Sequence, residues 1–425
     1  MNDFDECFRT GDERRTVADA LQKFNATLVP AAGIERVRTR DALGRILAED
    51  LVALADIPPY DNSAVDGYAV WFDDLATAGE TRLPVVARVA AGHPLAHPLA
   101  RRHATQIFTG APMPHGIDGA GPDTVFMVED CRADGADVIV PGGIKRGANR
   151  RHAGEDVRRG DVVLKPGSRL RPQDIGMAAS LGFAEIAIYS RLRVAVFSTG
   201  DEVREPGSVL NPGSIFDANR YALMSMLERL GCAVSDLGIF PDKAERIRSA
   251  LDRAAGSHDL LVTSGGVSRG EEDHVRSAVA ALGAVNFWNL AIKPGRPIAL
   301  GHIRTLDRPV PFIGLPGNPV AVMVTFLLIA RPIVMRLAGA ADAAPAAFRV
   351  AAGFDFKKKA GRREWLRSRL IRSEQGLVVD KFPEEGSGIL TSMVATDGLV
   401  ELAEDNTGVR RGDLVDFLPY SELMG

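Results

Sequence analysis

The feature that most constrains the fold is the alternation of short apolar runs with helical segments from Arg193 onward. RVAVFSTG, AVSDLGIF and DLLVTSGG end in turns, and NRYALMSMLERLG and KAERIRSALDRAA between them have helical length and spacing. A helix, the strands AVNFWNLAI, PIALGH and PVPFIG, and a long helix from Asn318 are expected to follow. Alternation of this kind requires crossover connections, which produce a parallel sheet covered on both faces. We therefore predict a parallel α/β domain over residues 191–340.

Residues 53–154 show a different pattern, in which β-rich runs alternate with tight turns. LPVVARVA, TQIFTG and DTVFMVED are separated by Gly, Pro and Asp, which is typical of a β-rich domain. Segments 16–28 and 40–50 repeat apolar residues at helical spacing. We therefore expect a helical linking domain made of residues 1–52 together with 155–190.

Residues 341–425 begin with a small-residue linker and continue as short strands. EWLRSRLI, GLVVDKF and DGLVELAED alternate with turns and predict a small C-terminal β-barrel or sandwich, of which we expect the barrel. A chain of 425 residues is too long for one compact core, so several domains are expected. The predicted fold class is a multidomain α/β protein.

Composition excludes several classes of protein. A net charge of -4 argues against a general nucleic-acid binder, because such proteins need a basic surface. Cys7, Cys131 and Cys232 are far apart, which indicates neither a zinc site nor a disulfide framework. The N-terminus is too polar for a signal peptide, and the apolar stretch 320–330 is too short to span a bilayer. We expect a soluble cytoplasmic protein.

Five loops follow the predicted strands and are rich in glycine, hydroxyl groups and charge. They are 198–202, 241–242, 264–268 with Asp273 nearby, 293–297 and 315–319. In an open parallel sheet these loops gather at the carboxyl edge, where ligands bind. Any one loop could be an ordinary turn with an Asp helix cap, and Asp201 remains open between capping and function. The combination of five loops favours a binding site.

The charged residues of these loops suit an anion accompanied by a metal ion. Lys293 and Arg296 carry charges suited to phosphate or another oxyanion, and glycines let backbone amides approach it. The carboxylates of Glu202, Asp242 and Asp273 are hard ligands of the kind that Mg²⁺ prefers. The sequence therefore predicts a site for a phosphate-like ligand and Mg²⁺.

Other polar segments have two interpretations. Asp66 lies in the turn-rich PPYDNSAVDGYAV and Thr109 in IFTGAPMP, and each could shape a turn or belong to a site. Arg367 and Ser387 could reach an oxyanion at the sheet edge or be ordinary surface residues. Ser268 lies in GVSRG, residues 266–270, which has the spacing G-x-S-x-G, but nothing else in the sequence indicates a Ser-His-Asp triad around it, so we do not expect nucleophilic serine catalysis.

Seven motifs occur in a fixed order along nearly the whole chain: DNSAVDGYAV, FTGAPMP, FSTGDEV, SIFDANRYAL, TSGGVSRGEEDH, AIKPGRP and GLPGNPVAVMVTF. In this order they resemble the molybdopterin molybdenumtransferase family, which includes MoeA and the E domain of gephyrin. The resemblance implies an elongated four-domain subunit that forms a homodimer, with an adenylyltransferase-like sheet domain. It implies insertion of molybdenum from molybdate into adenylylated molybdopterin, with Mg²⁺ and release of AMP. The adenylyltransferase and molybdoenzyme maturation factors are the implied further partners, without nucleic acid or membrane.

The resemblance also implies roles for individual residues. Asp66 and Thr109 would approach the site from the partner subunit, and Lys293 would act at the site with them. Glu202, Asp242 and Asp273 would handle the metal and the pyrophosphate. The remaining residues would line the substrate pocket or hold its loops: Ser268, Arg296, Pro297, Pro316, Pro319, Arg367 and Ser387.

The chain departs from the family pattern near the KPG loop. Asn289 stands where many members carry a basic residue, and Arg296 replaces the second lysine of KPGKP. Arg296 keeps the charge but presents a planar fork, and Arg269 adds a cation nearby. Two alternative functions stay open: a molybdopterin adenylyltransferase, which would depend on ATP, and a gephyrin-like scaffold protein.

Overall fold

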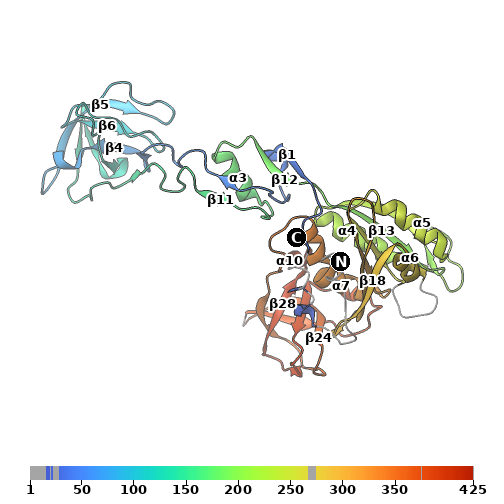
Figure 1. The fold of residues 1–425 in the computed structure, drawn as a ribbon. Helices are drawn as coiled ribbons and strands as arrows, with labels where there is room; N and C mark the ends of the chain where they lie inside the picture. Colours follow the sequence, from blue (N-terminus) through green and yellow to red (C-terminus); the bar gives the residue numbers. More distant parts are fainter. Residues whose placement is uncertain (1–15, 20, 23–27, 267–273, 375, 425) are drawn as a thin grey trace.

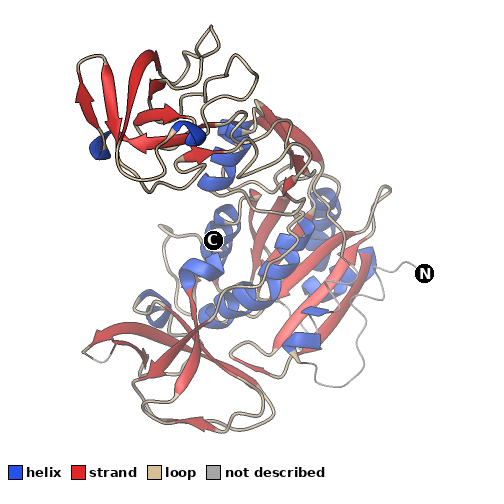
Figure 2. Cartoon of the chain, turned by 90° about the vertical axis from the view of Figure 1, so that its left-hand side faces the viewer, coloured by secondary structure: helices blue, strands red, loops and turns tan. Residues whose placement is uncertain are grey.

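The computed structural model of this chain is elongated (Figure 1). It describes residues 16–19, 21–22, 28–266, 274–374 and 376–424. A strand-rich N-terminal region lies at one end, and the α/β sheet and a C-terminal barrel lie together at the other. Figure 2, a view turned by 90°, again separates the N-terminal strands from the barrel.

The central sheet contains strands in the order β16 (Ala233–Phe240), β13 (Arg193–Thr199), β17 (Leu260–Ser264), β21 (Val310–Leu315), β20 (Pro297–Ile303) and β18 (Gly283–Asn289). The neighbours β16, β13, β17 and β21 pair in parallel, as predicted. The sheet is mixed, however, because β20 runs antiparallel to both β21 and β18. The loop 304–309 joins β20 to β21 and is too short for the crossover of about a dozen residues that a parallel pair needs.

Helices cover both faces of this sheet, as the alternating pattern predicts. Val194 and Val196 of β13 belong to one apolar cluster, whereas Ala195 and Phe197 belong to another. Successive side chains of a strand point to opposite faces, so each cluster lies on its own side. The first cluster includes residues of α4 (Ala218–Arg229) and α7 (Pro319–Thr325); the second includes residues of α5 (Ala244–Ala255) and α6 (His274–Leu282).

The helix that follows β21 is long, apolar and internal. It comprises α7, the π-helical η4 (Phe326–Ala330) and α8 (Arg331–Leu337). Among the described residues, this helix, Pro319–Leu337, has the length and the mean hydropathy of 2.0 that would suit a membrane span, and it is longer than the apolar stretch identified in the sequence. It is 83% buried inside the protein, as expected of a core helix.

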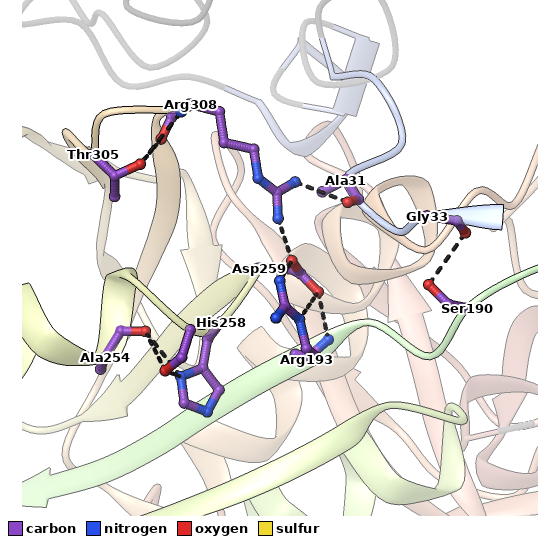
Figure 3. A network of polar contacts seen from close by, with 10 residues as sticks. Ala31, Gly33, Ser190, Arg193, Ala254, His258, Asp259, Thr305 and Arg308 are labelled. Atoms are coloured by element: carbon purple, nitrogen blue, oxygen red, sulfur yellow. Dashed lines mark hydrogen bonds and ion pairs between the residues drawn. The ribbon is translucent and has the colours of Figure 1, made fainter. Parts of the chain in front are cut away.

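A polar network fixes the amino end of the sheet (Figure 3). The carboxylate of Asp259 accepts hydrogen bonds from Arg193, 2.8 Å away, and from Arg308. Burial opposes ionisation of this carboxyl, but the hydrogen bonds from Arg193 keep the pKa of Asp259 below its usual value. Arg308 also donates to the carbonyl of Ala31 at 2.8 Å. The network therefore ties the chain before β1 (Ile34–Arg38) to the edge of the sheet opposite the candidate site.

The N-terminal region is β-rich, as predicted. Its main sheet has the order β7 (Thr124–Met127), β4 (Gly67–Val70), β6 (Ala104–Ile107), β5 (Thr81–Val89), β9 (Asp137–Val140) and β8 (Arg132–Asp134). The region between this sheet and the α/β sheet contains β1 paired with β12 (Glu185–Tyr189), β2 (Leu51–Val52) paired with β11 (Val162–Leu164), and α3 (Pro172–Ser180). It therefore mixes strands with a helix.

The helix predicted over 40–50 does not form. Only the short 3-10 turn η1 (Thr39–Asp41) is present, and Gly44 has a φ of +73°, which an α-helix does not accommodate. Leu47 instead forms a bridge with Ile188 of β12. Of the helix predicted over 16–28, residues 17–19 and 21–22 are helical.

The C-terminal region is a closed β-barrel, as predicted. Its strands are β24 (Arg363–Ser373), β25 (Gly376–Lys381), β22 (Phe348–Ala352), β28 (Leu414–Pro419) and β26 (Gly398–Leu402), and β26 pairs back with β24. A further strand, β19 (Ile292–Lys293), comes from the α/β region and pairs in parallel with β24. Trp365 and Leu399 of the barrel share an apolar cluster with Leu327 and Ile333 of the long helix. The barrel and the α/β sheet are thus joined by both backbone and apolar contacts.

Other short elements are η2 (Phe72–Asp74), β3 (Asn62–Ser63), η3 (Val128–Asp130), β10 (Arg150–Arg151), β14 (Val203–Arg204), β15 (Ile215–Phe216), β23 (Phe356–Lys357), α9 (Thr391–Val394), β27 (Gly408–Val409) and α10 (Tyr420–Met424).

Candidate functional site

Three of the predicted loops meet at the carboxyl edge of the parallel strands. The amide of Gly265, after β17, donates to the carbonyl of Leu315 at 3.1 Å. A Cβ added to Gly317 would lie 3.9 Å from the Cα of Gly265, so the loops after β17 and β21 are neighbours. Gly266 has a φ of +61°, and a Cβ there would lie 2.6 Å from Thr199 Oγ1. Glycine therefore permits both the left-handed turn and its close approach to the end of β13.

The KPG loop joins this group from the other side. Gly295 has a φ of +90°, and a Cβ added there would lie 2.4 Å from Thr325 Cγ2 of α7. Lys293, at the start of the loop, pairs through β19 with Glu364 of the barrel strand β24. The loop therefore lies between the long helix and the barrel, and its lysine is positioned by backbone pairing.

Lys293 contacts two carboxylates of the C-terminal barrel region. Its Nζ lies 2.8 Å from Glu385 Oε2 and 3.6 Å from Glu364 Oε2. The side chain of Glu364 is 1% exposed, and its Oε1 accepts a hydrogen bond of 2.7 Å from Arg362. The hydrogen bond from Lys293 holds the pKa of Glu385 below its usual value. The ammonium of Lys293 is thus surrounded by negative charge, although a third of its side chain is exposed.

Arg367 and Ser387 meet this region through a loop of the barrel, residues 384–388. The carbonyl of Ser387 accepts a hydrogen bond of 3.0 Å from the amide of Val320 in α7. Arg367 is 5% exposed, and it donates to the carbonyl of Glu384 at 2.9 Å and to Ser392 Oγ at 3.0 Å. Burial lowers the pKa of Arg367. The guanidinium of Arg367 therefore supports the loop from the barrel strand β24, while the loop itself lies against α7.

The carboxylates of Glu202 and Asp242 follow adjacent strands. β13 and β16 pair up to Thr199 and Phe240, so both residues lie just beyond the same edge. Glu202 is exposed, and a Cβ added to Gly200 would lie 2.7 Å from its Oε2, which places the carboxylate over the turn. Asp242 is half-buried.

These two carboxylates are hard oxygen donors of the kind that Mg²⁺ prefers, so the donor chemistry fits that ion. The third predicted carboxylate, Asp273, and the predicted substrate residue Ser268 lie outside the described residues. Within the described ranges, no group of three or more His, Cys, Asp or Glu side chains is arranged to hold a metal ion. The predicted metal site stays a prediction that depends on Asp273.

The other predicted substrate residues line the same edge. Arg296 and Pro297 are exposed where β20 begins. Pro316 is buried, and Pro319 is the first residue of α7, where the missing amide of proline costs no hydrogen bond. Asn219 Nδ2 donates to the carbonyl of Gly317 at 2.7 Å and so ties this loop to α4.

Asp66 and Thr109 are brought together beside β4 and β6, strands that lie at the other end of the molecule from the α/β sheet (Figure 1). Oδ1 of Asp66 accepts hydrogen bonds of 2.8 Å from both the amide and the Oγ1 of Thr109. These two bonds, the amide first, lower the pKa of Asp66. Asp66 is exposed, so its ionised carboxylate faces solvent on the strand-rich region.

Sequence reasoning missed three residues that organise the loops. Glu364 and Glu385 contact Lys293. Glu385 could have been suspected from the sequence, because it lies two residues before the predicted site residue Ser387. Arg220, in the motif SIFDANRYAL, is 1% exposed and bonds Asp217 at 2.9 Å, and it also bonds Asp236 and Glu205. Burial disfavours the charge, but the hydrogen bonds from Asp217 and Asp236 raise the pKa of Arg220 above its usual value. This ion-pair network anchors the chain that follows Glu202.

Comparison with known families divides the chain into three matched regions. Residues 15–182 match the MoeA N-terminal region (domain I and II), residues 195–336 match a probable molybdopterin binding domain, and residues 349–420 match the MoeA C-terminal region (domain IV). The first match spans the strand-rich N-terminal sheet and the region that joins it to the α/β sheet, and the other two fall on the α/β sheet and the barrel.

Relatives match over nearly the full length. A molybdopterin molybdenumtransferase of Haemophilus influenzae is 37% identical over 96% of this chain and 100% of its own length. Molybdopterin molybdenumtransferase 2 of Mycobacterium tuberculosis is 32% identical over 94% of this chain and 96% of its own. The solved structure of a molybdopterin biosynthesis MoeA protein from Pyrococcus horikoshii superposes with a TM-score of 0.81 at 28% identity, covering 96% of this chain and 100% of that one. Sequence motifs, domain order and fold agree, and the chain belongs to the molybdopterin molybdenumtransferase family of molybdenum cofactor biosynthesis.

Proposed function

We propose that this protein inserts molybdenum from molybdate into adenylylated molybdopterin, releases AMP and forms molybdenum cofactor. We further propose that it uses Mg²⁺ and works as a cytoplasmic homodimer. The observation that carries the proposal is the meeting of the loops after β13, β17 and β21 with the KPG loop, which presents Lys293. The family membership of the chain supports the same substrates.

The loop cluster offers groups that suit two anions. Lys293 is a point charge held by β19, and the exposed Arg296 can donate two parallel hydrogen bonds to an oxyanion. Backbone amides of the glycine turn at 265–266 can approach a phosphate because no Cβ intervenes. These groups would hold molybdate against the phosphoanhydride and stabilise the charge that develops when AMP leaves.

Glu202, Asp242 and Asp273 are the residues that would hold Mg²⁺. When bound there, the ion would supply charge neutralisation for the pyrophosphate of the substrate. Glu202 follows β13, which is the neighbour of β17, and Asp242 follows β16, which lies one strand further out along the same edge. In the proposed homodimer, Asp66 and Thr109 would reach this edge from the partner subunit.

The test is the release of AMP from adenylylated molybdopterin by the purified protein with molybdate and Mg²⁺, in the absence of ATP. AMP and molybdenum cofactor should form in equal amounts, and omission of molybdate or addition of a chelator should reduce both. AMP formation that requires ATP would indicate an adenylyltransferase instead. The absence of any product under these conditions would refute the proposed reaction.

A further inference from the structure

The two carboxylates that contact Lys293 differ in their surroundings. Glu364 is a residue of β24, is 1% exposed and also bonds Arg362, so it is a fixed part of the barrel. Glu385 lies in the loop 384–388 and its side chain is 44% exposed. Glu364 is therefore a permanent counter-charge of Lys293, whereas Glu385 can leave without uncovering a buried charge.

A second lysine is available to Glu385. Lys381 Nζ lies 3.8 Å from Glu385 Oε1, while Lys293 Nζ lies 2.8 Å from Oε2. The Lys381 side chain is 15% exposed and is held in place by bonds to the carbonyls of Phe382 and Pro383, at 3.0 and 3.1 Å. The carboxylate of Glu385 can thus give up Lys293 and remain paired with Lys381.

The charge balance around Lys293 bears on how an anion could bind there. Lys293 shares its ammonium between two carboxylates, of which Glu364 also pairs with Arg362 and Glu385 also pairs with Lys381. An oxyanion that approaches Lys293 would meet the exposed carboxylate of Glu385 already on its ammonium, and the two like charges repel each other. Removal of Glu385 from Lys293 restores a cation that is oriented by Glu364 and by the β19–β24 pairing.

We propose that Glu385 competes with the oxyanion substrate for Lys293, and that molybdate binds by taking the place of the Glu385 carboxylate. This inference rests on the proposed function, because it assumes that Lys293 receives molybdate. Glu385 is then a specificity-determining residue: an anion binds only if it attracts Lys293 more strongly than the built-in carboxylate does. Binding of molybdate is thereby coupled to a loop of the C-terminal barrel.

The test is calorimetric titration of the full-length protein with sodium molybdate. Glu385→Gln should bind molybdate about three- to tenfold more tightly than the original protein, because it removes a competing charge of a partly exposed pair. Glu384→Gln is the matched control, since it makes the same charge change one residue away, and its affinity should equal that of the original protein. Lys293→Ala should lose binding. Amide hydrogen exchange in residues 384–390 should rise when molybdate is added to the original protein.

The outcomes separate the two proposals. If Lys293→Ala loses molybdate but Glu385→Gln binds it no more tightly than the original protein, the competition is refuted and the oxyanion site stands. If binding becomes measurable only in Glu385→Gln, the competition is supported. If Lys293→Ala binds molybdate as the original protein does, both the competition and the proposed oxyanion site at Lys293 are refuted. An equal gain in Glu384→Gln would also refute the competition, since the effect would then be general to the loop's charge.

Discussion

The loop cluster at the sheet edge and the Asp66–Thr109 turn both carry predicted catalytic residues, but their surroundings differ. In the cluster, Lys293 contacts two carboxylates, and loops from two domains are joined through backbone hydrogen bonds. In the turn, Asp66 is exposed, and the described hydrogen bonds to its carboxylate come from Thr109. The two regions lie at opposite ends of an elongated chain (Figure 1). A single chain therefore carries two parts of the proposed site that are far from each other.

The largest expected effect is that of removing the cation from the cluster. Lys293→Ala should slow AMP release by a factor of about 100 or more, since a lost charge-stabilising donor typically costs that much. The measurement is the rate of AMP release at saturating substrates. Lys165→Ala, which changes an exposed lysine outside the cluster, should retain the full rate. Equal rates in Lys293→Ala and the original protein would show that the cluster is not the reacting part of the site.

The second prediction tests whether the two regions act together across subunits. Asp66→Ala and Lys293→Ala should each be inactive as homodimers. Co-expression should form mixed dimers in which one of the two sites is intact, so activity should recover to about a quarter of the original. AMP release by the co-expressed mixture is the measurement, with separately purified and unmixed variants as the control. No recovery in dimers shown to be mixed would mean that both residues act within one chain.

Much of the fold follows from periodicity, but the direction of β20 does not. The run that became β13 places Val194 and Val196 on one face and Ala195 and Phe197 on the other, a pattern that the sequence already shows. An apolar strand such as β20 pairs equally well in either direction. The length of the loop 304–309 would have predicted the antiparallel direction, because a loop this short permits only a hairpin. Gly44 likewise carried the signal against a helix over 40–50.

The sequence predicted which loops form the candidate site, but it predicted few of the contacts between their side chains. Glycine positions after strands placed the turn at Gly265 beside the loop at Gly317, as the sheet topology requires. The sequence could not show whether Arg367 is exposed or buried, because β24 brings it beneath a loop that is distant in sequence. For the same reason the pairing of Lys293 with Glu385, 92 positions away, needed the structure.

The third prediction concerns the support of the barrel loop. Arg367→Ala should lower the free energy of unfolding by about 2–3 kcal/mol, because the buried Ser392 hydroxyl and the carbonyl of Glu384 would lose a charged donor. The midpoint and slope of urea unfolding measure this change. Arg369→Ala, at an exposed position of the same strand, should change it by less than about 0.5 kcal/mol. Similar losses in both variants would mean that Arg367 does not hold the loop.

The smallest effect is expected at the Asp66–Thr109 turn. Thr109→Val removes the hydroxyl donor but keeps the backbone amide, so the pKa of Asp66 should rise toward its ordinary value. Because the pKa of Asp66 is lower in the folded protein, its contribution to stability is present above the unfolded pKa and is lost as the pH falls through the folded pKa. The stability difference between the two proteins is therefore present in full above the unfolded pKa of about 3.9 and disappears as the pH falls through the folded pKa. Titration of ¹³C-labelled aspartate carboxyls by NMR measures the shift, and Asp66→Asn identifies the signal by its loss. An unchanged pKa in Thr109→Val would assign the stabilisation of the Asp66 carboxylate to the amide of residue 109 alone, and the hydroxyl would then remain free for a ligand.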